Sequence, residues 1–180
     1  AKTVQKDSSS ATSYLLKIIA DIGWDFDIEG ALAELERSDC YDGWQKELRY
    51  FFYRYEEFLS KQTKKQIDES EWIQIWKTNP NNSIEHILPQ SRTLRCWKGI
   101  SESKHAKYKN RLGNLVLLAP RLNSEAGNKC FKDKQNVYNR ARLLALDDLT
   151  SKNEWTIKAI EERTAKLIEF AREQWRDLEV

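Results

Sequence analysis

Apolar residues recur at helical spacing over most of the chain, which predicts a mainly helical fold. The clearest case runs from Trp44 to Lys61, where a stripe of aromatic and aliphatic residues is typical of a helix packed on a core. The stretch Glu71–Trp76 fits either a short helix or a strand. Further helices are predicted at Thr12–Ile22, Ile28–Arg37, Ser101–Lys109 and Lys129–Arg142, and a long final helix is expected to be capped by Thr150 or Asn153.

Two short apolar runs interrupt this helical pattern. The first, Ile84–Leu88, contains a polar pair and is stopped by a proline. The second, Leu115–Ala119, follows a turn at Gly113–Asn114, and Pro120 then opens a helix that carries Asn123. We therefore expect a mainly α (α+β) fold, in which one small hairpin is embedded in a helical domain.

The same pattern divides the chain into four segments. Residues 1–10 are polar and serine-rich and are predicted to be disordered, and residues 11–82 form a helical scaffold. Residues 83–142 hold the two strands and their helix, and residues 143–180 are expected to pack as C-terminal helices on that core. A chain of 180 residues is expected to be one domain, and its lack of Met indicates a fragment of a larger protein.

Two simple features bear on location. No apolar run approaches the roughly 20 residues that span a bilayer, so no membrane partner is expected. The cysteines Cys40, Cys96 and Cys130 are odd in number and lack the paired spacing of metal ligands. We therefore interpret them as reduced thiols of a cytoplasmic protein.

Charge is unevenly distributed along the chain. The segment from Ser91 to Arg142 has thirteen Lys and Arg against three acids, a net charge of +10. The rest of the chain has 17 basic and 25 acidic residues, a net of 17 − 25 = −8. A strongly basic segment that begins just after the first strand favours a polyanionic partner such as nucleic acid, although a solvated helical face is the plainer interpretation.

The polar residues of the hairpin region suit phosphodiester hydrolysis. That reaction needs a base to activate water, a divalent cation to offset phosphate charge, and cationic groups to hold the polymer. His86 is one of two histidines, and a neutral imidazole is a suitable base near pH 7. Glu85 and Asn123 offer the oxygen ligands that Mg²⁺ prefers. Asn114, in the turn, is placed to orient the histidine. His105, on a basic helix, is expected to be exposed.

Three blocks carry a family resemblance: Ile84-Glu85-His86-Ile87-Leu88-Pro89, Leu112-Gly113-Asn114-Leu115 and Leu122-Asn123. Together they resemble the HNH (His-Me finger, ββα-metal) nucleases. More closely, they look like the HNH-like C-terminal domain of GmrSD-type, modification-dependent restriction enzymes. Asn128, Phe131 and Lys134, and the aromatic helix before the first block, extend the resemblance to more than half of the chain.

The resemblance implies a role for each matched position. His86 would be the general base, Asn114 the middle residue that orients it, and Glu85 and Asn123 the ligands of Mg²⁺ or Mn²⁺. Supporting or DNA-binding roles are expected for Asn128, Lys134, Arg121, Lys132 and Arg111. The substrate would be double-stranded DNA. The full-length protein would carry an N-terminal nucleotide-hydrolysing sensor domain and act in antiviral defence.

Some alternatives stay open at this stage. Neighbouring residues on a regular strand point to opposite faces, so Glu85 and His86 cannot both face one metal unless the strand is distorted. An HNH-like module that binds DNA without cutting it, a nuclease that acts on RNA, and a helical interaction domain are the other function classes.

Overall fold

The computed structural model describes residues 27–66 and 68–176 of the chain. Its α-helices are α2 (Ile28–Leu35), α3 (Gln45–Thr63), α4 (Glu69–Trp76), α5 (Glu102–Tyr108), α6 (Pro120–Ala126), α7 (Phe131–Tyr138), α8 (Asp147–Thr150) and α9 (Ile157–Trp175). Its two strands are β1 (Ile84–His86) and β2 (Leu115–Leu117), and short 3-10 turns are η1 (Pro80–Asn82), η2 (Arg95–Trp97), η3 (Leu112–Asn114) and η4 (Leu144–Leu146).

The prediction of a mainly helical α+β fold with one hairpin is confirmed. The ambiguous stretch Glu71–Trp76 lies in the helix α4. Ser101 caps α5 as expected, because its hydroxyl accepts the Lys104 backbone N–H at 3.3 Å. The helix expected at Thr12–Ile22 and the disorder expected over residues 1–10 lie outside the described residues.

The predicted start of the last helix was wrong. Thr150 instead ends the short helix α8, and α9 begins at Ile157 with Thr156 as its cap. The Thr156 hydroxyl accepts the backbone N–H of Ala159 at 3.2 Å. The sequence pattern missed this because several polar residues that can cap a helix precede α9, and the local pattern does not select among them.

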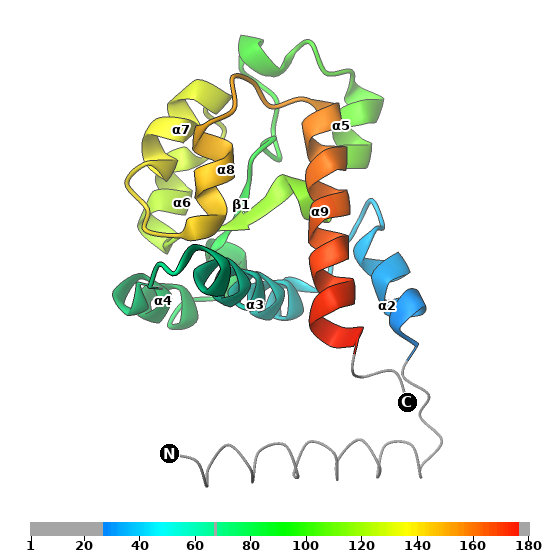
Figure 1. Ribbon diagram of the computed structural model, residues 1–180. Helices are drawn as coiled ribbons and strands as arrows, with labels where there is room; N and C mark the ends of the chain where they lie inside the picture. The colour runs from blue at the N-terminus through cyan, green and yellow to red at the C-terminus, as the bar shows by residue number, and fades with distance from the viewer. Residues whose placement is uncertain (1–26, 67, 177–180) are drawn as a thin grey trace, which may run out of the picture.

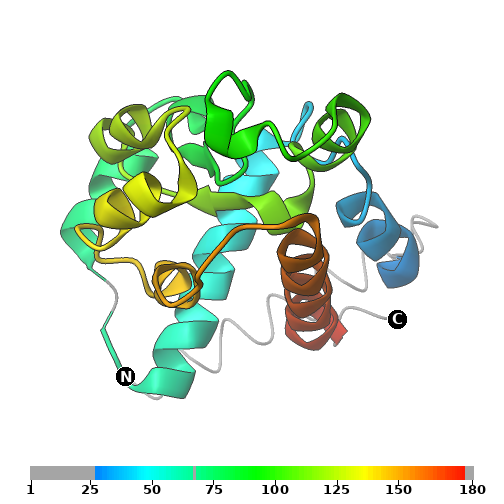
Figure 2. The same cartoon turned by 90° about the horizontal axis from the view of Figure 1, so that it is seen from above.

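The hairpin lies at the centre of the molecule. β1 and β2 pair antiparallel, with Glu85 opposite Val116 and His86 opposite Leu115. Figure 1 shows α6, α7 and α8 on one side of the strands and α9 on the other, and Figure 2 shows α3 crossing beneath them. Because helices cover the strands on several sides, the apolar residues of both strands are buried, and the polar residues between them are held in fixed positions.

Helix α9 packs directly on the turn that leads into β2. A Cβ at Gly113 would lie 2.1 Å from the carbonyl oxygen of Ile160, so only glycine permits this approach. The Gly113 N–H donates to Thr164 Oγ1 at 3.1 Å, and Arg163 donates to the Gly113 carbonyl at 2.9 Å. The C-terminal helix thereby fixes the position of the neighbouring Asn114.

Two of the three cysteines form a disulfide, which corrects the prediction of reduced thiols. Cys96 and Cys130 are 34 residues apart in sequence, and their Cα atoms lie 5.9 Å apart, within the range that a disulfide needs. Sequence spacing could not show this, because the fold brings the loop at η2 to the start of α7. Cys40 alone is a free, buried thiol, as expected. The expectation of a cytoplasmic protein loses the support that it drew from reduced cysteines.

A search of the described helices for a membrane span, by length and apolar character, found none that qualifies.

Candidate active site

A small pocket of about 160 Å³ lies at the end of β1. Four of the residues expected at an active site border it: Glu85, His86, Asn123 and Asn128. The other lining residues come from the loop before α3, from η1, from β1 and the turn after it, and from the end of α6; they are Tyr41, Asn81, Ile84, Pro89, Gln90 and Gly127. Strand β1 and helix α6 therefore bring the expected residues together, although Asn123 follows His86 by more than thirty positions in the sequence.

His86 is held by a residue that the sequence analysis did not identify. Its Nε2 lies 3.2 Å from Oδ1 of Asn110, and the Asn110 Nδ2 group donates to Asp42 Oδ2 at 3.0 Å. Because a carboxylate can only accept here, the Asn110 amide must turn its oxygen toward His86. In the neutral imidazole the proton then sits on Nε2 and the lone pair on Nδ1. Nδ1 has no hydrogen-bond partner among the described residues.

The surroundings of His86 favour its neutral form. The pKa of His86 is lowered to about 4, mainly by burial and also by the positive charges of Lys134 and Lys109, while the bond with Asn110 opposes the shift. The ring also meets the edge of Tyr41, with ring centroids 4.6 Å apart. His86 is therefore an uncharged, oriented base at neutral pH.

Asn114 is fully buried and acts on the backbone after His86 rather than on the imidazole. Its Oδ1 accepts the Leu88 N–H at 2.7 Å and the Trp155 indole N–H at 2.9 Å. Its Nδ2 donates to the carbonyls of Leu88 and Lys109, at 2.8 and 2.7 Å. The predicted hydrogen bond from Asn114 to the ring is absent from the described contacts. Asn114 fixes the chain that carries the histidine, and Asn110 fixes the ring.

The Glu85 carboxylate points toward α7. Its Oε1 accepts from Lys134 Nζ at 2.6 Å and from the Tyr138 hydroxyl at 2.9 Å, and Oε2 is bound by neither. Burial raises the pKa of Glu85, and the attraction of Lys134 opposes that rise. The role of Glu85 as a metal ligand stays a prediction, in which the carboxylate would be shared with Lys134.

Lys134 was expected to have a supporting or a DNA-binding role, and its contacts lie inside the fold. It is fully buried, and besides Glu85 its ammonium binds the carbonyl oxygen of His86 at 2.6 Å. A buried cation cannot reach a phosphate on the surface, so of the two expected roles the contacts of Lys134 favour support over DNA binding. Lys134 is instead a support that joins α7 to the strand carrying His86.

Asn123 presents one side of its amide to the pocket. Its Nδ2 donates to the Asn82 carbonyl at 2.9 Å and lies 3.4 Å from the Ile84 carbonyl. These contacts fix the amide orientation, and Oδ1 has no hydrogen-bond partner among the described residues. An oxygen anchored in this way suits a hard cation such as Mg²⁺.

The remaining predicted residues fall into two groups. Arg121, Lys132 and Asn128 are exposed and could contact a polymer. Arg111 is half-buried and donates to the Glu36 carbonyl at 2.9 Å, so its guanidinium serves the fold. His105, expected to be exposed, is buried, and its Nε2 lies 2.7 Å from the Pro89 carbonyl oxygen. That expectation was wrong because the helix α5 packs its His face on the turn after β1.

The described residues contain no group of three or more His, Cys, Asp or Glu side chains that could hold a metal. Any cation here would depend on amide oxygens, one carboxylate, water and the substrate itself. That is the usual mode of Mg²⁺, which keeps several waters and takes few protein ligands. The donors that border the pocket therefore fit Mg²⁺ or Mn²⁺ better than Zn²⁺.

Asn110 and Asp42 left little trace in the sequence. Asn110 follows the basic helix α5, and Asp42 lies in a turn some 68 residues earlier. Neither belongs to the motif blocks. Their only sequence feature is that both are short polar residues in predicted loops.

Searches against curated proteins and against solved structures found no match. A family model described as "GmrSD restriction endonucleases, C-terminal domain" matches residues 25–170, which include every residue of the candidate site. The chain belongs to the family of GmrSD restriction endonuclease C-terminal domains.

Proposed function

We propose that this restriction endonuclease domain is an HNH-type, metal-dependent nuclease that hydrolyses phosphodiester bonds in double-stranded DNA. The observation that carries the proposal is the orientation of His86. A neutral imidazole with its lone pair on Nδ1 borders the same pocket as the anchored oxygen of Asn123.

In the proposed reaction His86 Nδ1 takes a proton from water. The water oxygen attacks phosphorus, one P–O ester bond breaks, and the leaving oxygen takes up a proton from solvent. Asn110 keeps the proton of the resting imidazole on Nε2, and Asp42 keeps Asn110 in the orientation that permits this. Lys134 holds the carbonyl of the histidine itself, and Asn114 holds the backbone of Leu88 after it.

Asn123 Oδ1, with the Glu85 carboxylate, would hold Mg²⁺ or Mn²⁺. When bound, the cation would offset negative charge on the phosphate. The order β1, β2, α6 places His86 on the first strand and Asn123 on the helix, as the ββα-metal arrangement of HNH nucleases implies.

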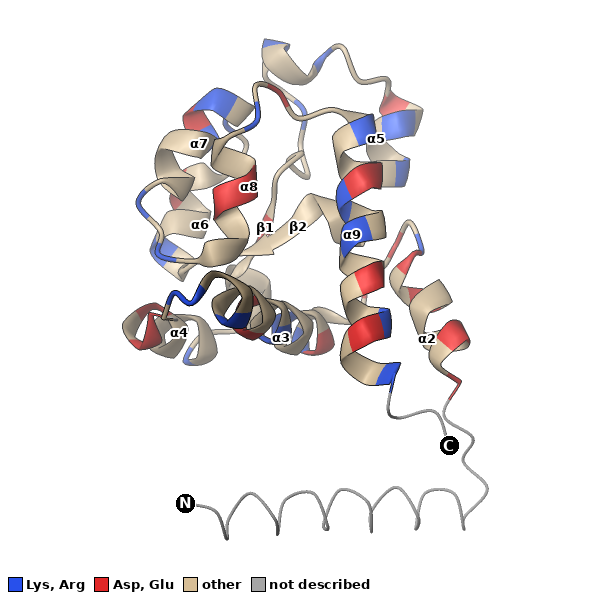
Figure 3. Ribbon diagram, viewed as in Figure 1, with Lys and Arg blue, Asp and Glu red and all other residues tan. Residues whose placement is uncertain are grey.

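The exposed cations around the site support a nucleic-acid substrate. Figure 3 shows Lys and Arg on η2, α5 and the nearby end of α7, whereas acidic residues mark α2 and α4. Arg121 and Lys132 are exposed and belong to the segment whose net charge is +10. Such a distribution attracts a polyanion through long-range electrostatics.

The family supports a wider biological proposal. This domain would be the effector of an anti-phage, modification-dependent restriction protein, and an N-terminal nucleotide-hydrolysing domain of the full-length protein would sense the modified DNA. The described residues contain no Gly-rich loop of the kind that binds the phosphates of a nucleoside triphosphate, so this part of the proposal rests on the family alone.

Purified protein incubated with supercoiled plasmid tests the reaction class. Mg²⁺ or Mn²⁺ should convert the plasmid to open-circle or linear DNA, and EDTA should prevent the conversion. A structured RNA of similar length serves as the matched substrate, and faster cleavage of RNA would assign that polymer instead. DNA binding without cutting under either metal would identify a binding module and contradict the proposal.

A further inference from the structure

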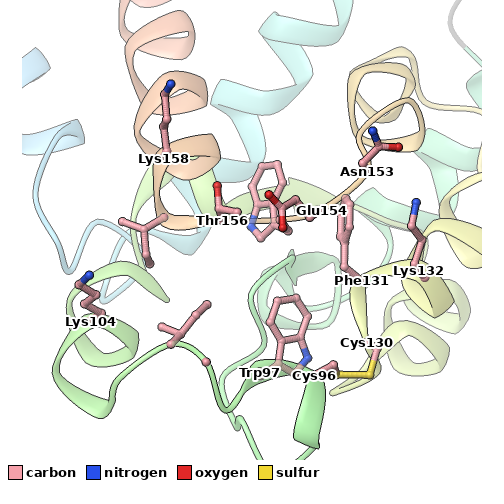
Figure 4. A pocket seen from close by; sticks show the side chains of 14 residues that line it. Cys96, Trp97, Lys104, Cys130, Phe131, Lys132, Asn153, Glu154, Thr156 and Lys158 are labelled. Carbon is pink, nitrogen blue, oxygen red and sulfur yellow. A yellow bond between two sulfur atoms is a disulfide. The ribbon is translucent and has the colours of Figure 1, made fainter.

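A second and larger cavity opens on the basic side of the molecule. Its volume is about 520 Å³, and residues from η2, α5, α7 and the start of α9 line it. Figure 4 shows Lys104, Lys132 and Lys158 on separate sides of the opening, with Trp97 and Phe131 between them. None of these residues borders the pocket of His86.

The walls of this cavity combine apolar surface with cations. Trp97 and Trp155 are almost fully buried, with their indole N–H groups bonded to the Lys129 carbonyl and to Asn114 Oδ1. These bonds fix both rings, so their cavity-facing surfaces form rigid walls. Ile100 and Ile157, both half-buried, complete the apolar lining.

Two of the three cations at the opening have no acidic partner among the described residues. Lys104 and Lys132 form no salt bridge with any residue in the described part of the chain. Lys158 lies in the first turn of α9, and that turn contains no acidic residue. Its ammonium lies 3.7 Å from a carboxylate oxygen of Glu162, one turn further along the helix. Glu154 is the only acid in the lining, so three cations face one carboxylate.

We propose that this cavity binds one nucleotide. The lysines would hold its phosphate, the apolar walls would cover its base, and Glu154 with Asn153 would accept hydrogen bonds from base or sugar. A cavity of this volume lies within the range of small-molecule sites, which are mostly apolar with a few placed polar groups. Phosphate alone would leave the apolar walls empty, and an apolar ligand alone would leave the cations without a partner.

The cavity adjoins the candidate active site through two connections. Cys130 in its wall follows Asn128, which borders the pocket of His86, by two residues. Trp155 in its wall bonds to Asn114, which holds the chain after His86. We therefore assign the nucleotide to the nucleic-acid substrate, as an unpaired unit close to the cleaved strand. Only this assignment of source rests on the proposed function.

Nuclear magnetic resonance of the indole N–H groups tests the proposal without any cleavage. The protein is labelled with ¹⁵N-tryptophan and kept free of divalent metal, and the Trp97 and Trp155 signals are assigned with Trp→Phe variants. Deoxyadenosine monophosphate, deoxyadenosine, inorganic phosphate and a short single-stranded oligonucleotide are then titrated separately. The nucleotide should shift the Trp97 and Trp155 signals and bind at least about tenfold more tightly than the nucleoside or phosphate.

Two sets of variants separate the parts of the site. Lys104→Gln with Lys132→Gln should weaken nucleotide binding about tenfold, whereas Lys61→Gln with Lys77→Gln, exposed lysines elsewhere, should change it less than about twofold. Gly99→Leu should block the base and spare phosphate, because a Cβ at Gly99 meets no atom within 4 Å and projects into open space at the lining.

Several outcomes would overturn the assignment. Unmoved Trp97 and Trp155 signals at about 10 mM nucleotide, or equal affinity for phosphate and nucleotide, would each reject a nucleotide site. An oligonucleotide that binds more tightly than the mononucleotide supports the substrate as source, and the reverse identifies a free nucleotide. If the wild-type protein binds the nucleotide but does not cleave plasmid with either metal, the proposed nuclease is refuted and the nucleotide site stands.

Discussion

Replacement of Lys134 by Met tests how the candidate site is built. The substitution keeps an unbranched side chain of similar shape and removes the ammonium, which binds Glu85 Oε1 and the His86 carbonyl at 2.6 Å each. Lys134 is 0% exposed, so water cannot replace these contacts. Removal of one partner from a buried ion pair costs about 3–5 kcal/mol, because the other charge stays buried without compensation.

That loss has a measurable size. For a domain of this length 1 kcal/mol corresponds to about 2–4 °C in Tm, so Lys134→Met should lower the Tm by about 6–20 °C. Lys132→Met, on the exposed face of the same helix, is the matched control and should change the free energy of unfolding by less than about 0.5 kcal/mol.

The double variant decides whether the pair itself is responsible. In Glu85→Gln with Lys134→Met neither member of the pair is charged, so the two substitutions should not add. A double-mutant cycle from urea denaturation should then give an interaction free energy of about 2–3 kcal/mol. A loss below about 1 kcal/mol in Lys134→Met, or strict additivity, would refute the description of Lys134 as the buried support of β1.

Three further predictions concern neighbouring features. Asn110→Ala should slow plasmid nicking about 10- to 100-fold, because the ring of His86 loses the contact that orients it. In ¹⁵N spectra of the variant the imidazole proton should be shared between Nδ1 and Nε2. An unchanged tautomer would contradict the assigned orientation. His86 has a pKa of about 4 when folded against 6.5 unfolded, so the unfolded state binds more protons at His86 between these values, and the stability that His86 contributes should fall as the pH is lowered through that window. Because the pKa of Glu56, raised to about 7, acts in the opposite direction, the effect is measured by urea denaturation as the difference in free energy of unfolding between wild type and His86→Gln. That difference should move against the wild type by about 3 kcal/mol from neutral pH to pH 4, and a difference that does not change with pH would argue against a buried neutral His86. Gly113→Ala should lower the free energy of unfolding by about 3 kcal/mol, because its Cβ would lie 2.1 Å from the Ile160 carbonyl oxygen. Gly99→Ala, whose Cβ meets no atom within 4 Å, should change that free energy by less than about 0.5 kcal/mol. Equal effects would refute the close packing of α9 on the turn.

The parts of the fold that depend on local pattern were predictable from sequence. The strands around His86 and Leu115 are apolar runs bounded by turn residues, and the helix with Asn123 begins at Pro120, so their order was readable without tertiary information. The family motif then placed His86 and Asn123 around one site, and the structure brings both to one pocket.

The parts that depend on distant contacts were not predictable. Lys134 lies 49 residues from Glu85, and no local rule distinguishes a lysine that will be buried from one that will face solvent. Asn110 reaches His86 across 24 residues, and Cys96 meets Cys130 only because the η2 loop folds against α7. In each case the partner is selected by the packing of helices around the hairpin, which is not encoded in spacing.

The role of His86 as the base is tested most directly by plasmid cleavage with wild type and His86→Ala side by side in Mg²⁺, after thermal unfolding has confirmed that the variant folds. Wild type should convert supercoiled DNA to open-circle or linear product, and His86→Ala should do so at least about 100-fold more slowly. Cleavage by His86→Ala at the wild-type rate would contradict the account, because the base would then be another group.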